Sequence, residues 1–241
     1  ACGALLSKII LQEDALISFT LQQPFNYYNV PYYIILGLLA GFLSLYYARM
    51  FTWVDLKMKA VSNLWIRVLL GGTLLFAMLI FFPPLFGEGY ESIKSLSLLQ
   101  PGQLTKVSIV NSLIRNDMHL LLFLGALMFL KTIAAAITTG SGGNGGSFAP
   151  SLFVGAYLGF VYSRFINLTG IAKIPETNFT LVAMAGILSG VFYAPLTAIF
   201  LIAEITGGYE LMIPLMIVSA LSVTVTKYFE PLSMEGKKLS H

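Results

Sequence analysis

A glycine-rich run at residues 140–150, with the sequence GSGGNGGSFAP, is the part of the chain whose residue types most clearly suggest chemistry. Glycine permits close approach of the backbone to a ligand, and proline suits the first turn of a helix, which the apolar residues after Pro150 would continue. Free N–H groups at a helix N-terminus, together with the positive end of the helix dipole, bind an anion without a formal charge. We therefore predict an anion-binding site made by Gly145, Gly146, Ser147, Phe148 and Pro150.

The same run has two other interpretations. A Gly/Ser run is also the composition of a flexible linker. No charged residue lies between Lys131 and Arg164, however, so the run would sit at membrane depth, where a solvated linker is unstable. A Walker phosphate loop would end in Gly-Lys-Ser/Thr, whereas Ser147 and Phe148 stand at that point here. We reject the phosphate loop and keep the linker as the weaker alternative.

Long uncharged segments that could position this run occur along the whole chain, and a bilayer core takes about 20 helical residues to cross. The sequence predicts long helices at 31–48, continued by an amphipathic extension to 58, at 68–82 and at 120–139, and a short helix at 91–99 within the more polar stretch 87–117. Shorter apolar segments follow at 148–165, 179–188, 196–205 and 211–225, with expected breaks at Gly190, Pro195, Gly207-Gly208 and Pro214. Interrupted segments at membrane depth are tolerated where the backbone faces protein or a water-filled cavity, and they indicate a transport site.

Composition places the chain among membrane proteins and excludes several functions. Of its 241 residues, 57% are apolar and only 10% are charged, whereas soluble domains have about 25% charged residues. The net charge of +3 is too small for a nucleic-acid-binding surface. A single cysteine and two distant histidines form neither an internal disulfide nor a Cys/His metal site. We expect no metal and no cofactor.

The distribution of charge predicts the orientation. The loop between the first two long helices carries four basic residues and one acid, namely Arg49, Lys57, Lys59, Arg67 and Asp55. By the positive-inside rule this loop is cytoplasmic, and the Lys237-Lys238 pair places the C-terminus on the same side. The sequence thus predicts an integral protein of the plasma or inner membrane, with a cytoplasmic C-terminus.

A few side chains within the apolar segments need an explanation of their own. Lys131, inside a long helix, is expected to pair with a carbonyl or carboxylate, because an unpaired intramembrane cation costs about 2.5–3.5 kcal/mol or more. Glu204 is expected to serve packing near a helix end rather than proton relay. A group of aromatic residues brackets the first long helix and predicts an interfacial belt: Tyr27, Tyr28, Tyr32, Tyr33, Tyr46, Tyr47, Phe51 and Trp53.

Three motifs in order resemble the CLC family of chloride channels and proton-coupled chloride transporters. The sequence GSFAP at 146–150 resembles the family's GxFxP signature. The segment 190–206, with APLT at 194–197 and AEIT at 203–206, resembles its next signature, and YELMIP at 209–214 resembles the helix that follows. The resemblance covers the whole chain and is strongest from Leu130 to Lys227.

The resemblance implies an all-α, polytopic membrane fold of the antiparallel-repeat CLC type with short broken helices. The chain, 1–241, would be a single membrane domain that corresponds to the second repeat, with the N-terminal half of the same protein as its partner. The N–H groups of Ser147 and Phe148 would contact a chloride ion, which is a transported ligand rather than a cofactor. Family members are homodimers, and the matching contact segments are 1–11, 196–206 and 211–226.

One position departs from the family. A tyrosine near the end of the family's domain offers its hydroxyl to the central anion, and counting back from the lysines places Glu235 there. A carboxylate beside the anion would repel it by about 4 kcal/mol at 4 Å and an effective dielectric of 20. Glu235 is therefore expected either to face a solvated vestibule or to act as a titratable inner gate.

Two functions from other classes compete with anion transport. A membrane-embedded enzyme that modifies lipids would need a nucleophile or paired carboxylates with a base, and the sequence contains no such cluster. A membrane scaffold without transport would use the glycines for close helix packing. Anion transport is the favoured interpretation, and the protein is not expected to be an enzyme. Channel and exchanger both remain open, as do chloride, fluoride and nitrate.

Overall fold

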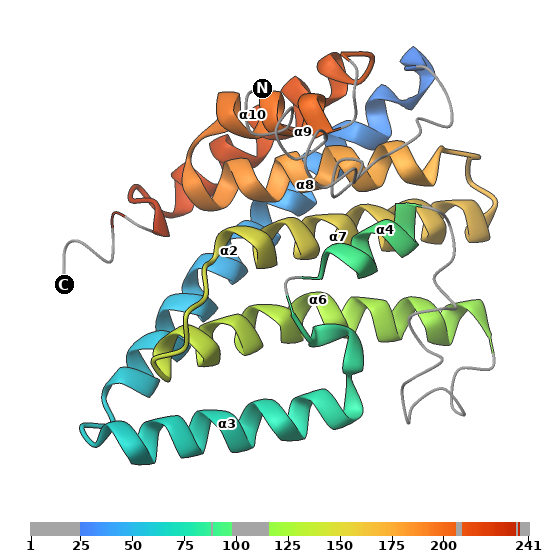
Figure 1. The fold of residues 1–241 in the computed structure, drawn as a ribbon. Helices are drawn as coiled ribbons and strands as arrows, with labels where there is room; N and C mark the ends of the chain where they lie inside the picture. Colours follow the sequence, from blue (N-terminus) through green and yellow to red (C-terminus); the bar gives the residue numbers. More distant parts are fainter. Residues whose placement is uncertain (1–24, 88, 98–115, 206–208, 235, 237–241) are drawn as a thin grey trace, which may run out of the picture.

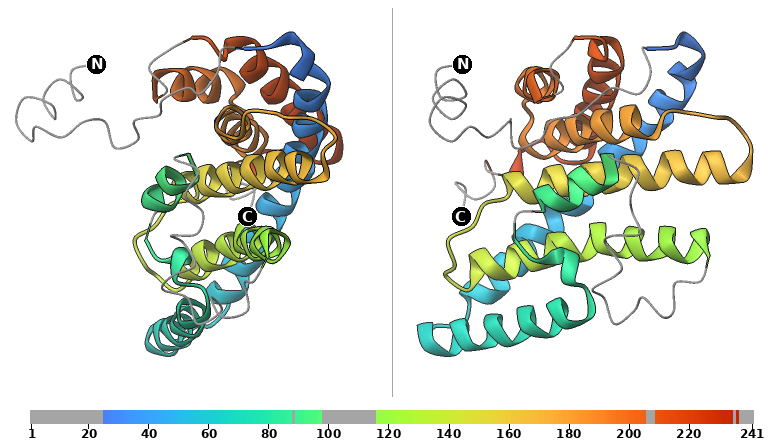
Figure 2. Two further views of the ribbon diagram at one scale, coloured as in Figure 1. Left: turned by 90° about the vertical axis from the view of Figure 1, so that its right-hand side faces the viewer. Right: turned by 45° about the vertical axis from the view of Figure 1, so that its right-hand side comes forward.

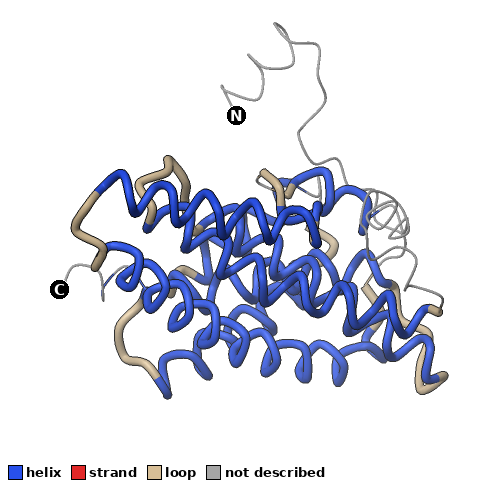
Figure 3. Tube along the Cα trace, turned by 90° about the horizontal axis from the view of Figure 1, so that it is seen from below, coloured by secondary structure: helices blue, strands red, loops and turns tan. Residues whose placement is uncertain are grey.

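A computed structural model describes residues 25–87, 89–97, 116–205, 209–234 and 236. Every regular element in these ranges is helical, as the tube in Figure 3 shows, so the all-α prediction is confirmed. Two 3-10 turns, η1 and η2, accompany eight α-helices over the described residues. Their bounds are η1 Tyr27–Asn29, α2 Val30–Lys59, α3 Leu64–Phe81, η2 Pro83–Leu85, α4 Tyr90–Ser97, α6 Asp117–Gly140, α7 Phe148–Thr169, α8 Glu176–Phe192, α9 Pro195–Ile205 and α10 Met212–Phe229.

The long helices agree with the apolar segments of the sequence. Five described segments are long and apolar enough to cross a membrane: Tyr27–Lys59, Leu64–Phe81, Asp117–Gly140, Phe148–Thr169 and Met212–Phe229. The helices α8 and α9 are apolar but shorter. The polytopic pattern of long helices mixed with short ones is therefore confirmed.

Two of the predicted breaks are wrong. Gly190 lies inside α8, and Pro214 lies in the first turn of α10, where a missing N–H costs nothing. The glycine serves packing, because a Cβ at position 190 would lie 2.5 Å from the hydroxyl oxygens of both Ser44 and Ser222. The chain instead turns between α8 and α9 at Tyr193, which has a left-handed φ of 58°.

The helices form a stack that one long helix crosses. Figures 1 and 2 show α3, α6, α7 and α8 side by side in that order, with α9 and α10 beyond α8. Helix α2 runs obliquely across this stack. It contacts α10, α8 and α6 and, over smaller areas, α7 and α3. Because α2 touches almost every layer, its inward face can reach the loop between α6 and α7.

Helix α8 is the centre of the packing although it is only 17 residues long. All its residues from Glu176 to Val191 are buried, against α7, α10, α2 and α9. A helix that is apolar on all sides is expected to be enclosed by other helices. Its closest approach is to α7, where Gly155 and Gly159 leave the two backbones almost in contact.

Part of the predicted aromatic belt is wrong. Tyr27 and Tyr28 are exposed by 75% and 87%, as anchors at an interface would be. Tyr33, Tyr47 and Phe51, in contrast, are exposed by no more than 1% and belong to the core. These three residues follow the helical spacing that α2 presents to the rest of the stack, so their position on the helix rather than their type decides their burial.

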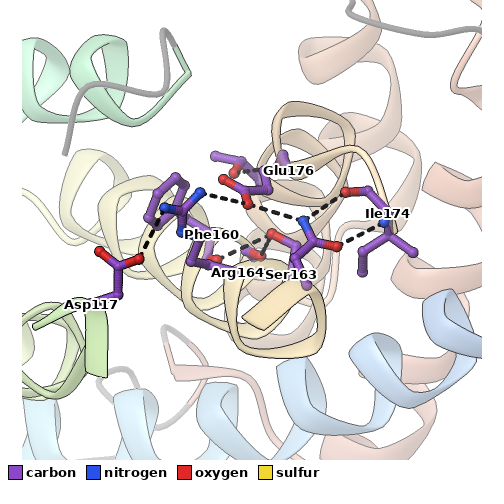
Figure 4. A network of polar contacts seen from close by, with 9 residues as sticks. Asp117, Phe160, Ser163, Arg164, Ile174 and Glu176 are labelled. Carbon is purple, nitrogen blue, oxygen red and sulfur yellow. Dashed lines mark hydrogen bonds and ion pairs between the residues drawn. The ribbon is translucent and has the colours of Figure 1, made fainter. Parts of the chain in front are cut away.

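A polar network joins three helices at the end of the stack where α7 finishes and α8 begins (Figure 4). Arg164 on α7 lies 3.3 Å from the carboxylate of Glu176 on α8 and 3.5 Å from that of Asp117 on α6. Asn167 donates to Glu176 and to the carbonyl of Ile174, both at 3.0 Å, and accepts from the amide of Ile174 at 2.8 Å. The network holds the turn between α7 and α8 and links the end of α7 to α6.

Candidate functional site

The predicted anion site lies where α6 ends and α7 begins. Helix α7 starts at Phe148, its N-cap is Ser147, and no side chain caps the first turn. The first main-chain bond of the helix runs from the amide of Ser151 to the carbonyl of Ser147 at 3.2 Å. The amides of Phe148 and Ala149 precede that bond, so they have no acceptor within the helix. These free N–H groups stand at the positive end of a 22-residue helix dipole.

The loop before this helix is held at both ends. Just after α6, the amides of Ser141, Gly142 and Gly143 bond back to carbonyls of α6, at 2.9, 3.2 and 2.9 Å. Gly142 has a φ of 99°, which only glycine adopts readily, so the chain can reverse here toward α7. A loop with these bonds and a defined helix on each side is not a flexible linker.

The other end of the loop is held by a hydrogen bond from α2. The hydroxyl of Tyr47 donates to the carbonyl oxygen of Ser147 at 2.8 Å. Sequence reasoning missed this contact, because Tyr47 was assigned to the interfacial belt. Its spacing from Leu36, Ala40 and Leu43 on the buried face of α2 is a signal for the burial of Tyr47, although not for its partner.

The glycine loop opens on a pocket of about 540 Å³ between α3, α6 and the start of α7. Gly145, Gly146, Phe148 and Pro150 line it, whereas Ser147 is half-buried beside Tyr47. The sequence predicts that the run lies at membrane depth, and on this chain residues 142–146 are exposed. They are exposed because no described element covers that side of the pocket.

Lys131 lines the same pocket, so a buried positive charge lies in its wall. Its ammonium donates to the carbonyls of Leu85 and Gly87 at 2.9 and 2.7 Å and lies 4.8 Å from the centre of the Phe153 ring. The expected pairing with a carbonyl is confirmed. The lysine ties the turn after α3 to α6 and also adds to the positive potential of the pocket.

We expect Lys131→Met to lower the stability of the protein. Methionine fills a similar volume, but it leaves the carbonyl of Leu85, a 4% exposed residue, without this donor. An unsatisfied buried carbonyl costs about 1–3 kcal/mol. Thermal unfolding in detergent should therefore shift down by several degrees. Lys57→Met is the matched control, since that lysine is exposed and such changes stay within about 0.5 kcal/mol. Equal unfolding temperatures for the two variants would contradict the structural role of Lys131.

Two further predicted residues have different outcomes. Glu235 lies outside the described residues, so its role stays a prediction. Glu204 is exposed on α9, so the expected role in packing within this chain is wrong.

Near the end of the described chain, the carboxylate of Glu230 lies 2.6 Å from Arg49 on α2, and the hydroxyl of Tyr193 donates to the carbonyl of Glu230. The end of α10 is thus tied to the part of α2 that leads into the basic loop.

The helices define a polytopic, all-helical membrane protein. Residues 1–227 match the model of the family described as "Voltage gated chloride channel", so the chain belongs to this family. The family is one of channels and transporters, which excludes the lipid-modifying enzyme that the sequence left open.

Individual relatives agree with this assignment. The chain is 27% identical to the voltage-gated ClC-type chloride channel ClcB of Escherichia coli, over 92% of this chain and 50% of ClcB. It is 28% identical to the chloride channel protein CLC-f of Arabidopsis thaliana, over 82% of this chain and 25% of CLC-f. The crystal structure of a slow cyanobacterial Cl⁻/H⁺ antiporter has the same fold, with a TM-score of 0.74, 24% identity and coverage of 99% of this chain and 53% of the antiporter. The chain thus spans between about a quarter and about half of the length of these relatives.

Proposed function

We propose that this chain forms one half of a pathway for anion transport and that the start of α7 binds the anion. One observation carries the proposal: the free amides of Phe148 and Ala149 stand at the N-terminus of α7, and both residues line a pocket whose wall also includes Lys131. Gly145 and Gly146 let the anion approach the backbone, and Pro150 occupies a position in the first turn where no N–H is needed. Neutral amide dipoles bind an anion without trapping it, which transport requires.

Chloride is the anion to test first, because it is the ion named for ClcB and for the cyanobacterial antiporter. Chloride-loaded liposomes that contain the complete protein should release chloride faster than chloride-loaded liposomes without protein. Proton movement measured in the same vesicles would distinguish an exchanger from a channel. A complete protein that inserts but releases no anion would support the scaffold interpretation instead.

We also propose that the other half of the membrane domain completes the site. On this chain residues 142–146 of the glycine loop are exposed, and polar backbone at membrane depth needs cover by protein or a water-filled cavity. The other half of the membrane domain would supply this cover on the open side of the pocket.

The chain alone should accordingly be silent. Chloride-loaded vesicles that contain only residues 1–241 should lose chloride at the rate of vesicles without protein, because the hydrogen-bond donors on one side of the anion are missing. Co-expression with the other half of the membrane domain is the control and should restore efflux. Efflux from the chain alone above the background would show that this half is sufficient.

A homodimer through α9 and α10 is the remaining part of the proposal. Each helix presents one exposed stripe: Leu196, Phe200 and Glu204 on α9, and Ile213, Met216, Ala220 and Thr224 on α10. The stripes follow the helical spacing of three or four residues, and their apolar members can pack on a second copy. The segment 1–11, which was expected at the same interface, lies outside the described residues.

A further inference from the structure

The peptide group between Ser147 and Phe148 is the link between α2 and the proposed anion site. In a trans peptide the C=O and the N–H point in opposite directions, so the direction of one fixes the direction of the other. The carbonyl oxygen of Ser147 accepts from the amide of Ser151 at 3.2 Å and from the hydroxyl of Tyr47 at 2.8 Å. Both acceptor positions of this oxygen are therefore used.

We propose that Tyr47 is a positioning residue for anion transport. Its hydroxyl and the amide of Ser151 together hold the carbonyl of Ser147 along the axis of α7. The N–H of Phe148 then points away from the helix at its N-terminus, where the pocket lies. The inference rests on the proposed function, since it concerns the donor that the anion would use.

The surroundings of Tyr47 make the tie rigid. The residue is 0% exposed, and its ring stacks on Phe51 with 5.9 Å between the centroids. The tyrosine and the serine are 100 residues apart in sequence, so the bond joins two helices rather than neighbours in one. A peptide held from α2 cannot rotate when the anion leaves, and the site stays organised between transport cycles.

Tyr46 provides a matched control on the same helix. Its hydroxyl also donates to a main-chain carbonyl, that of Phe129 on α6, at 3.3 Å. Its ring also packs on an aromatic partner, Phe129, with 5.0 Å between the centroids. Tyr46→Phe therefore removes the same chemical group from a contact that does not involve the loop.

The experiment compares Tyr47→Phe and Tyr46→Phe in the complete protein, reconstituted in liposomes. The half-saturating chloride concentration for efflux should rise about three- to tenfold in Tyr47→Phe, the effect of one lost hydrogen bond, and stay unchanged in Tyr46→Phe. A purely structural role would lower the maximal rate, through the amount of folded protein, without changing half-saturation. Calorimetric titration of the detergent-solubilised variants with chloride decides the same question where a variant inserts poorly.

Each other outcome overturns the inference. An unchanged half-saturating concentration and an unchanged chloride affinity in Tyr47→Phe would show that the hydroxyl does not position the donor. Equal shifts in both variants would indicate a general effect on α2. If the parent transports chloride and Tyr47→Phe behaves like it, only the positioning role fails. If the parent neither binds nor transports chloride, the proposed function fails and the positioning role with it.

Discussion

Gly159→Val should leave almost no correctly folded protein. A Cβ at position 159 would lie 2.3 Å from the carbonyl oxygen of Phe179 and 2.6 Å from the Cα of Thr180, both main-chain atoms of α8. A main chain cannot rotate away as a side chain can, and α8 is enclosed by α2, α9 and α10 on its other sides. Overpacking in a core costs about 1–3 kcal/mol and occasionally more, and two helix backbones forced apart belong to the upper end.

The matched control is Gly125→Ala, another glycine in the middle of a long helix. Nothing lies within 4 Å of the position that its Cβ would occupy, so alanine should stabilise α6 by about 0.5–1 kcal/mol. Size-exclusion chromatography and thermal unfolding in detergent measure both variants. A Gly159→Val protein that elutes as a single folded species with the parent's unfolding temperature would show that the contact between α7 and α8 is not the tight packing described above.

The membrane helices could be predicted from the sequence because lipid imposes one rule on every residue of a span. Long stretches without charge identify α2, α6 and α7 to within a few residues, and the pair Pro83-Pro84 identifies the end of α3. Glycine and proline within the shorter segments were harder to interpret. Gly190 indicated a break from its type alone, whereas it allows α2, α8 and α10 to approach closely. The sequence does not tell which neighbour a glycine faces.

The loop at the start of α7 could be predicted for a similar reason: a glycine run followed by proline and an apolar helix has few other uses at membrane depth. Its supports could not. Tyr47 reaches Ser147 across 100 residues, and the carbonyls of Leu85 and Gly87 reach Lys131 across 46 and 44. Such contacts depend on how the helices cross. A tyrosine near the end of an uncharged segment fits an interfacial anchor and a buried donor equally well until the crossing is known.

Gly146→Asp should reduce anion transport about a thousandfold, whereas Gly146→Asn should reduce it much less. Gly146 has no positive φ, and the nearest atom to an added Cβ is the amide nitrogen of Phe148 at 3.9 Å, so a side chain fits there in front of the free N–H. An aspartate carboxylate would occupy the place of the anion and repel another. The penalty is about 4 kcal/mol for unit charges 4 Å apart at an effective dielectric of 20, which corresponds to roughly a thousandfold in affinity.

The comparison with asparagine separates charge from size, because the two side chains have the same shape. Both residues are favourable before a helix, and the aspartate also suits the helix dipole, so neither change should prevent folding. Chloride efflux from liposomes that contain the complete protein measures the effect, with the amount of inserted protein determined in parallel. Equal losses in the two variants would indicate a steric block without an anion at this place. Normal transport in Gly146→Asp would mean that the anion does not bind at the start of α7, because a fixed carboxylate 4 Å away cannot be neutral to it.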